Sequence, residues 1–465
     1  MDEFRMMCVK LPSVKMKKKI SIKFETQKDL PSLEKKQMFK HTFHQKKEEI
    51  MNTELYEIYR GFVNPYTLIN TNYEIGQYIH KVTGIITRTL PDLKPKELSR
   101  AYFKMWEIIF EKELLPDSSK PIICANIAEA PGGFIQAIIN YRKINANGNA
   151  NGHANGHANG NTNGHANGNQ VNKNYKNKYI AISLKEHSNR NNSESESKPH
   201  GPSFESYKPH IKEFMQKYKN NLKILNISYG NQNYNDGDLN KLANIKAYAK
   251  LFSNKKADFA TGDGGVPDLD DDASLNELNT THLIYNEIVT ALSVQALQGN
   301  FVLKIFTIWT RPMLELIYLI SMFYDTVEIV KPVTSKITSY ERYIIAKGFR
   351  GITQQQLNQL YEITDKWYEI DNFGGYKPAK EYPNKLFSFR IPTEFRNAVK
   401  KFDEEYTKLT EPMFTKLKEY IKEHKEGKKN KQHFIDILQK QQEIAIRWYK
   451  EHKIPIKKYN IIRFH

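Results

Sequence analysis

Four charged side chains occupy positions where a charge calls for an explanation. Lys304 lies among apolar residues in FVLKIF, and Asp263 closes the apolar run of ADFATGDGG. Glu341 opens the run of ERYIIAKG, and Lys104 lies in the amphipathic segment AYFKMWEIIF. A lysine beside a carboxylate can orient a hydroxyl group and accept its proton, provided that desolvation lowers the lysine pKa. Each residue alone also fits a simpler interpretation: an edge-strand lysine, a turn aspartate, a solvated strand-end carboxylate and a surface lysine.

A proline–glycine–glycine turn, Pro131-Gly132-Gly133, separates an apolar run from an amphipathic segment. The run IICANI (122–127) predicts a buried strand, and Phe134 begins a segment with apolar residues at helical spacing. Glycine lets the backbone approach a ligand without a Cβ atom in the way. The start of a helix offers free N–H groups. An ordinary strand-to-helix turn would have the same pattern, because short glycine motifs match many unrelated proteins.

Strands and helices alternate along the part of the chain that must position these residues. We expect strands at 179–182, 222–227, 257–265, 300–306, 326–330 and 343–346, and helices within 55–115 and at 275–298 and 311–323. This alternation predicts an α/β fold with a parallel or mixed sheet wound by helices. Ligands of such sheets bind at the carboxyl ends of the strands. The Pro-Gly-Gly turn and the glycines after Asp263 both lie at such an end.

The composition favours a polyanionic partner. The 465 residues include 70 Lys and Arg against 52 Asp and Glu, a formal net charge of +18, and nucleic acid is the partner that such an excess favours. Two cysteines, Cys8 and Cys124, exclude a disulfide scaffold and fit a reducing compartment. The longest apolar stretch, LELIYLISMF, contains Glu315 and is too short to span a bilayer, and the first residues do not resemble a secretory signal. We therefore expect a soluble intracellular protein with no membrane partner.

Shifts in composition divide the chain into four regions. Residues 1–50 predict a basic, solvated arm that could also contact phosphates or act as a localisation signal. The sequence predicts a helical extension at 51–97, the central domain at 98–350 and a basic helical region at 351–465. Within the central domain, residues 145–172 are rich in Asn, Gly and His and predict a disordered surface insert. We predict no metal site, either at the histidines of this insert or at the aspartates between 268 and 272.

The motifs together resemble one known family. AEAPGGF, TGDGG, FVLKIF and SYERYIIAKG occur in the order and approximate spacing of the FtsJ-like ribose 2′-O-methyltransferases, and SRAYFK resembles the helix that carries their first catalytic lysine. The resemblance covers about 98–349. It implies a Rossmann-like methyltransferase sheet, a catalytic tetrad and S-adenosylmethionine as the cofactor. The tetrad would consist of Lys104, Asp263, Lys304 and Glu341. The implied cofactor contacts are Pro131, Gly132, Gly133, Phe134, Ser183, Asp238 and Asp263.

The chemistry implied by this resemblance is methyl transfer to a ribose hydroxyl. That hydroxyl is a poor nucleophile and must be aligned with the methyl group that it attacks. Lys304 can accept the hydroxyl proton only when it is neutral. Apolar neighbours and a nearby Lys104 would lower the pKa of Lys304, whereas Asp263 and Glu341 would raise it. The sequence leaves the outcome of this competition open.

The segment 299–349 looks most like the cap-specific branch of the family, found in eukaryotes and large DNA viruses. Ribosomal-type members often have an acidic residue at the position of Ser183. A serine at this position is similar to what the cap-type members have. The resemblance implies methylation of the first transcribed nucleotide of capped mRNA, with capped RNA as the partner and other capping or transcription proteins as further partners. Two alternatives stay open: a ribosomal or transfer RNA methyltransferase, and a non-catalytic RNA-binding subunit of a capping or polyadenylation complex. The Asn- and Lys-rich composition points to a large DNA virus, and so to the host cytoplasm or the virion, with the nucleus not excluded.

Overall fold

The structure is a computed structural model of the 465-residue chain. It describes residues 5–16, 19–28, 54–70, 97–151, 177–185, 209–219, 225–265, 273–370, 381–428 and 431–455. The predicted disordered insert begins within this set, because helix α5 continues to Asn151, past the expected start at 145. The rest of the insert, and the aspartates between 268 and 272, lie outside the described residues.

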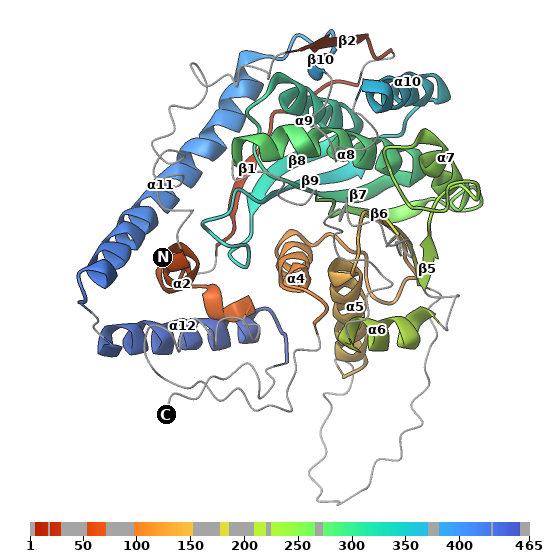
Figure 1. Cartoon of the computed structure of the whole chain (residues 1–465). Coiled ribbons are helices and arrows are strands. Elements are labelled where there is room, and N and C mark those ends of the chain that lie inside the picture. Colours follow the sequence, from red (N-terminus) through yellow and green to blue (C-terminus); the bar gives the residue numbers. More distant parts are fainter. Residues whose placement is uncertain are drawn as a thin grey trace, which may run out of the picture.

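A mixed sheet of eight strands forms the centre of the structure, in the order β1-β8-β9-β7-β6-β3-β4-β5 (Figure 1). Its strands are β1 (Met7–Lys10), β3 (Ile123–Ile127), β4 (Lys178–Ile182), β5 (Leu225–Ser228), β6 (Ala257–Gly262), β7 (Gln295–Ile305), β8 (Tyr324–Lys331) and β9 (Arg342–Phe349). Strands β3 to β7 run parallel, whereas β9 lies antiparallel between β7 and β8. This sheet confirms the predicted α/β, Rossmann-like fold.

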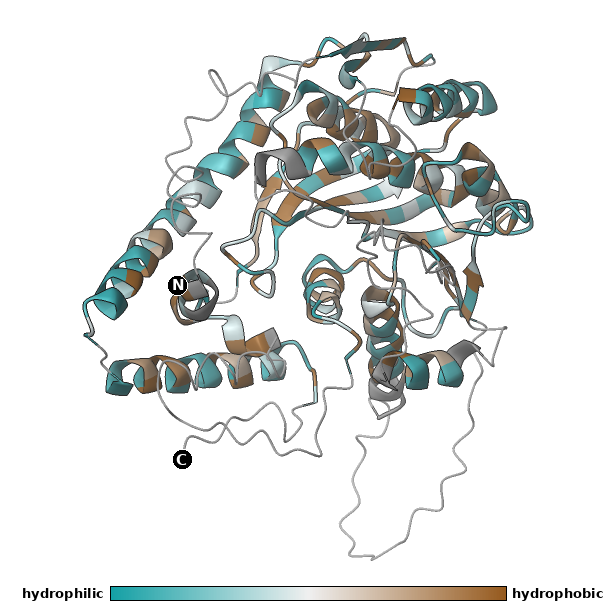
Figure 2. Ribbon diagram, in the orientation of Figure 1, coloured by the Kyte–Doolittle hydropathy of each residue, from teal (hydrophilic) through white to brown (hydrophobic). Residues whose placement is uncertain are grey.

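Helices cover both faces of the sheet. In Figure 1, α7 (Leu242–Lys250), α8 (Ala273–Val294) and α9 (Arg311–Phe323) lie on one face, and α4 (Ala101–Lys112), α5 (Gly133–Asn151) and α6 (Pro209–Lys219) lie on the other. Helix α10 (Gln354–Ile370) packs on α7 and α8. Figure 2 shows the apolar residues gathered on the strands and on the helices beside them. The core therefore lies on both sides of the sheet.

Helix α9 explains the longest apolar stretch of the sequence. Every residue from Pro312 to Phe323 is buried. The carboxylate of Glu277 accepts hydrogen bonds from the backbone N–H groups of Trp309 and Thr310, just before the helix begins. The buried Glu315 accepts from two N–H groups of strand β10 (Tyr382–Phe387), at 2.7 and 3.1 Å. The stretch is thus a core helix, and no helix among the described residues is long and apolar enough to cross a membrane.

The N-terminal residues depart from the predicted solvated arm. Strand β1 is an edge strand of the sheet and pairs antiparallel with β8, and β2 (Ile22–Gln27) pairs with β10 (Tyr382–Phe387). Met6, Val9 and Leu11 are buried. The prediction was wrong for this segment because the lysines dominate its composition, while its few apolar residues cover the end of the sheet.

The C-terminal region packs against the N-terminal one. It contains β10 as well as the helices α10, α11 (Thr393–Lys425) and α12 (Lys431–Glu451), so the expected all-helical pattern misses one strand. Helix α11 contacts α2 (Glu54–Val63) and β1, and α12 contacts α2 and the short helix η1 (Thr67–Asn70). Tyr59 of α2 lies within 6.0 Å of the rings of Tyr420 and Phe434. Elements of the N-terminal and C-terminal regions therefore pack on one another beside the sheet.

Candidate active site

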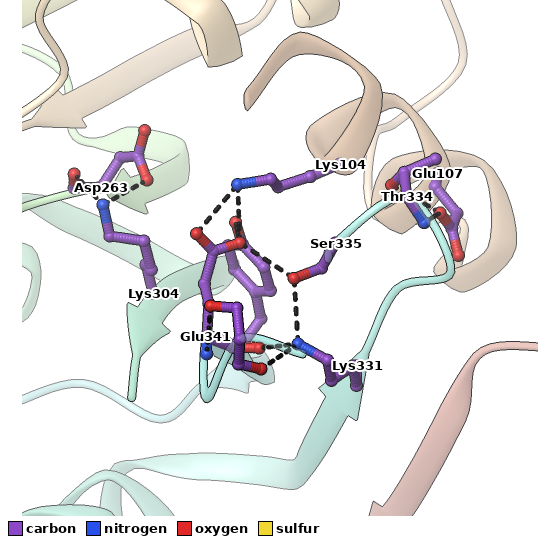
Figure 3. Close-up of polar contacts among 10 residues, drawn as sticks. Lys104, Glu107, Asp263, Lys304, Lys331, Thr334, Ser335 and Glu341 are labelled. Atoms are coloured by element: carbon purple, nitrogen blue, oxygen red, sulfur yellow. Dashed lines mark hydrogen bonds and ion pairs between the residues drawn. The ribbon is translucent and has the colours of Figure 1, made fainter. Parts of the chain in front are cut away.

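The four charged residues singled out in the sequence lie together at one edge of the sheet. Asp263 follows β6, Lys304 lies near the carboxyl end of the neighbouring β7, and Glu341 comes immediately before β9. Strand β9 is antiparallel to β7, with Tyr343 opposite Lys304, so its first residues lie beside the end of β7. Lys104 reaches the same place from helix α4 (Figure 3).

These residues form two ion pairs. The Lys304 Nζ atom lies 3.0 Å from Asp263 Oδ1 and donates a 2.8 Å hydrogen bond to the backbone carbonyl of Asp263. The Lys104 Nζ atom lies 2.7 and 2.8 Å from the two carboxylate oxygens of Glu341. All four side chains are 14 or 15% exposed. Each ammonium group is thus oriented by its own carboxylate, on a side chain that is partly exposed.

The charges of the two pairs answer the question that the sequence left open. Burial lowers the pKa of Lys304, but Asp263, Glu341 and Glu287 outweigh this effect and raise it above its usual value. Burial raises the pKa of Asp263, against the opposing effects of Lys304 and Lys104. For Glu341, burial is outweighed by Lys104 and Lys304, so its pKa lies far below the usual range. Lys304 therefore carries a proton in this state, and the carboxylates dominate over desolvation.

A further set of polar residues, which the sequence analysis did not identify, surrounds Glu341. Its Oε1 atom accepts from the hydroxyl of Tyr343 at 2.9 Å and from that of Ser335 at 3.2 Å. The buried Lys331 ammonium donates to the backbone carbonyl of Glu341 at 2.6 Å and to Ser335 Oγ at 3.1 Å (Figure 3). The available signal was a lysine at the end of the strand YDTVEIVK that follows two apolar residues, as Lys304 does in FVLKIF.

The two glycines of the Pro-Gly-Gly turn are required for different structural reasons. Gly132 has a φ of 104°, a conformation that favours glycine. A Cβ atom on Gly133 would lie 2.3 Å from Ser99 Oγ and 3.1 Å from Ala101 Cβ. The prediction that both glycines leave room for a ligand therefore fails at Gly133, where the space is filled by the start of α4.

The start of α5 also differs from the expectation of free N–H groups. The Phe134 N–H donates a 2.8 Å hydrogen bond to Glu129 Oε1, and the Phe134 ring is fully buried. Glu129 is itself buried, and its backbone carbonyl accepts from Gly132 N–H at 2.7 Å. Burial and the nearby Asp263 raise the pKa of Glu129 well above its usual value. This carboxyl, in the AEAPGG motif, thus braces the turn from inside the protein, and Phe134 packs in the core.

A second buried carboxyl braces the turn that follows β6. Glu287 of α8 accepts a 2.8 Å hydrogen bond from the Gly264 N–H group. Burial raises the pKa of Glu287 to about 8. A Cβ atom on Gly264 would lie 2.8 Å from the same Glu287 oxygen. The glycine after Asp263 therefore allows the carboxyl to approach the backbone and hold the turn.

The remaining predicted cofactor residues lie at the carboxyl ends of neighbouring strands. Ser183, just after β4, accepts a hydrogen bond from Ala130 N–H at 3.3 Å, which places it against the Pro-Gly-Gly turn. Gly237 packs on Ser183, because a Cβ atom there would lie 1.8 Å from the Ser183 carbonyl oxygen. Asp238 follows, and burial raises the pKa of its carboxyl, which accepts from Asn240 N–H at 3.0 Å.

This arrangement fits a cofactor with hydroxyl and amine donors. The turn at Pro131 and Gly132, the Ser183 hydroxyl and the Asp238 carboxyl adjoin one another at the ends of β3, β4 and β5. S-adenosylmethionine offers ribose hydroxyls and amino groups to such acceptors. Asp263 lies one strand further along the same edge. Pro131, Gly132, Ser183, Asp238 and Asp263 are thus suitably placed to hold it, and their contacts with it stay predictions.

The fold and the site together define a methyltransferase. The chain belongs to the FtsJ-like methyltransferase family, whose model matches residues 98–349. This confirms the family expected from the motifs, the class of enzyme, and S-adenosylmethionine as its cofactor.

Among individual proteins, the chain is similar to cap-specific mRNA (nucleoside-2′-O-)-methyltransferase 1 of several organisms. It is 30% identical to the Danio rerio protein over 135 residues, which covers 28% of this chain and 16% of that protein. For the Trypanosoma brucei brucei protein the values are 28% over 136 residues, 29% of this chain and 36% of that protein. The chain therefore matches between about a sixth and about a third of these relatives. A putative ribosomal RNA methyltransferase from Plasmodium falciparum superposes with a TM-score of 0.31 at 19% identity, covering 55% of this chain and 100% of that one.

Proposed function

We propose that the protein transfers a methyl group from S-adenosylmethionine to the ribose 2′-hydroxyl of the first transcribed nucleotide of capped mRNA. The observation that carries the proposal is the pairing of Lys304 with Asp263 and of Lys104 with Glu341 at one edge of the sheet. The similarity to cap-specific relatives supports the choice of substrate. An intracellular location is part of the same proposal.

The reaction requires alignment of the ribose hydroxyl and removal of its proton, and different residues of the site serve these two purposes. The new bond joins the ribose oxygen to the methyl carbon, the bond from that carbon to sulfur breaks, and the hydroxyl proton leaves to a base. Lys104 and Lys304 can both orient the hydroxyl, because a carboxylate holds each ammonium and both side chains are partly exposed. Such alignment can supply about 7–11 kcal/mol of the barrier reduction.

Lys304 is the base in this proposal, although it carries a proton in the present state. It must therefore release that proton before it can accept the one from the ribose. A positive charge placed beside Lys304 lowers its pKa, so binding of a cationic methyl donor favours this release. Asp263, which contacts Lys304, then stabilises the ammonium group that forms again during transfer.

The substrate is tested by a competition at fixed salt between short RNAs of one sequence, with and without a methylated guanosine cap. Transfer of a tritiated methyl group measures the rate, and nuclease mapping of the product locates the methyl group. We expect the capped RNA to be preferred by tens to hundreds of fold, since each base–aromatic stack is worth about 1–3 kcal/mol. Equal rates would contradict the cap preference.

The same assay distinguishes the alternatives. Methylation confined to an internal ribose would favour a ribosomal or transfer RNA substrate. Binding of RNA without any transfer would favour a non-catalytic subunit of a capping or polyadenylation complex. The net charge of +18 predicts phosphate contacts in every case, so RNA affinity should fall steeply with salt and does not discriminate.

A further inference from the structure

The loop between β8 and β9 ends at Glu341, and helix α11 holds it from the side. Inside the loop, the Ser339 N–H donates to the Lys336 carbonyl at 2.9 Å. The hydroxyl of Tyr406, in α11, donates to the loop carbonyls of Ile337 and Ser339, at 2.8 and 2.7 Å. The second of these carbonyls belongs to the residue two positions before Glu341. A buried side chain of α11 thus fixes the loop directly beside the site.

The same helix also holds the residue that follows Glu341. Arg342 is 2% exposed, and its guanidinium forms a buried ion pair with Asp403 of α11. It also lies 4.9 Å from the ring centroid of Phe402 and 5.5 Å from that of Tyr406. Glu341 is therefore anchored to α11 on both sides along the chain.

Lys331 connects these contacts to the site. Its ammonium lies 5.5 Å from the centroid of the Tyr406 ring and donates to the Ser339 carbonyl, which Tyr406 also contacts. The same ammonium donates to the Glu341 carbonyl at 2.6 Å. One compact polar cluster therefore joins α11 to the backbone of Glu341, and the Glu341 carboxylate in turn receives Lys104.

We propose that helix α11, through Tyr406 and Asp403, positions Glu341 for methyl transfer and thereby sets the place of the Lys104 ammonium. Tyr406 and Asp403 are positioning residues, since they act through the loop and Glu341. Helix α11 lies outside the segment that matches the family, residues 98–349. The C-terminal region is thus part of the machinery of the site, an inference that rests on the proposed role of Glu341 in methyl transfer.

The experiment compares Tyr406→Phe with a matched variant, Tyr449→Phe. The Tyr449 hydroxyl, in α12, is also buried and donates to a backbone carbonyl, that of Ile69, at 2.9 Å. Both variants remove one hydroxyl that bonds a backbone carbonyl, but only Tyr406 contacts the loop of Glu341. A misplacement of about 1 Å can cost about a hundredfold in rate. We expect kcat to fall by about tenfold to a hundredfold in Tyr406→Phe and to change less than about twofold in Tyr449→Phe.

Two further measurements separate positioning from general stability. The Kd of S-adenosylmethionine, measured by calorimetry, should be unchanged in Tyr406→Phe, since the Tyr406 hydroxyl bonds the loop between β8 and β9, whereas the predicted cofactor contacts follow β3, β4, β5 and β6. In Tyr406→Phe, amide hydrogen exchange should become faster in peptides that cover 332–342. In Tyr449→Phe, the exchange rate of the same peptides should equal that of the unmodified protein. Asp403→Asn provides a second variant for the same comparison, because it weakens the pair with Arg342.

The outcomes are distinct for the two proposals. Equal kcat losses in Tyr406→Phe and Tyr449→Phe, or a kcat within about twofold of the unmodified protein in both Tyr406→Phe and Asp403→Asn, would overturn the positioning role. Absence of transfer by the unmodified protein on every RNA would instead overturn the proposed function. Hydrogen exchange would then still show whether Tyr406 holds the loop of Glu341.

Discussion

The ammonium of Lys104 lies 2.7 and 2.8 Å from the two carboxylate oxygens of Glu341, a residue 237 positions further along the chain. Helix α4 supplies the cation, and the residue before β9 supplies the anion. Two such charges in a poorly solvated place depend on each other, because removal of one leaves the other without a counter-charge. The geometry therefore predicts how substitutions at this site change activity and stability.

Lys304→Ala should reduce methyl transfer by at least about a hundredfold and leave S-adenosylmethionine binding nearly intact. The physical reason is the loss of the ammonium that Asp263 orients, and general acid–base groups contribute about 10²–10⁴-fold. Calorimetry and the tritiated-methyl assay on one sample measure both quantities. Lys347→Ala is the matched control, since Lys347 lies in the adjacent β9 and donates to the Lys112 carbonyl, away from Asp263. Appreciable turnover by Lys304→Ala would remove Lys304 as the base.

Glu341→Gln should lower the thermal midpoint as well as the activity. The substitution leaves Lys104 without its counter-charge, and breaking a buried ion pair costs up to about 3–5 kcal/mol. Adding Lys104→Met should recover part of the lost stability without recovering transfer, because the second change removes the unpaired charge. Thermal unfolding of the two single variants and the double variant measures this coupling. Strictly additive losses would show that the two side chains do not stabilise each other.

The buried Glu287 should make stability depend on pH in a particular direction. Its pKa is raised from 4.5 to about 8, so between these values the folded protein binds more protons there than the unfolded chain does. The free energy of unfolding then falls as pH rises from about 5 to 8. Glu287→Gln keeps an oxygen for the Gly264 N–H and removes this titration. Its stability relative to the unmodified protein should grow by a few kcal/mol over that range.

Denaturant unfolding at several pH values between 5 and 8 measures this dependence. Glu362→Gln is the control, because the Glu362 side chain is 55% exposed and pairs with Lys366 at the surface. Its unfolding free energy should follow that of the unmodified protein at every pH. A difference between Glu287→Gln and the unmodified protein that stays constant across the range would refute the proposed titration.

Removal of residues 152–170 should change stability by less than about 1 kcal/mol and leave methyl transfer unaltered. These residues consist only of Gly, His, Ala, Asn, Thr and Gln, and each doubling of loop length costs only about 0.6 kcal/mol of closure entropy. Helix α5, which ends at Asn151, is left complete by this choice of ends. The assay and the thermal midpoint of the shortened protein check the prediction, and failure to fold would show that the tract supports the domain.

Features with a local signal were predictable from the sequence. Apolar runs followed by glycine or by a charged residue indicated the strands β3, β6 and β7 and the position of Asp263 and Lys304. The order of the motifs indicated the family. The segment LELIYLISMF was correctly excluded as a membrane span, because its single glutamate and its length fit a buried helix. Such signals are local since side-chain periodicity and turn chemistry depend on neighbouring residues.

The tertiary structure alone decided the contacts between distant parts of the chain. It paired Lys104 with Glu341 and Lys304 with Asp263, set the charge of Lys304, and filled the space at Gly133 with α4. It also placed β1 at the end of the sheet and Tyr406 against the loop of Glu341. Composition and periodicity do not identify these partners, because strand register and helix packing bring together residues that are tens to hundreds of positions apart. The charge of a buried group depends on those neighbours, and so it follows from the fold.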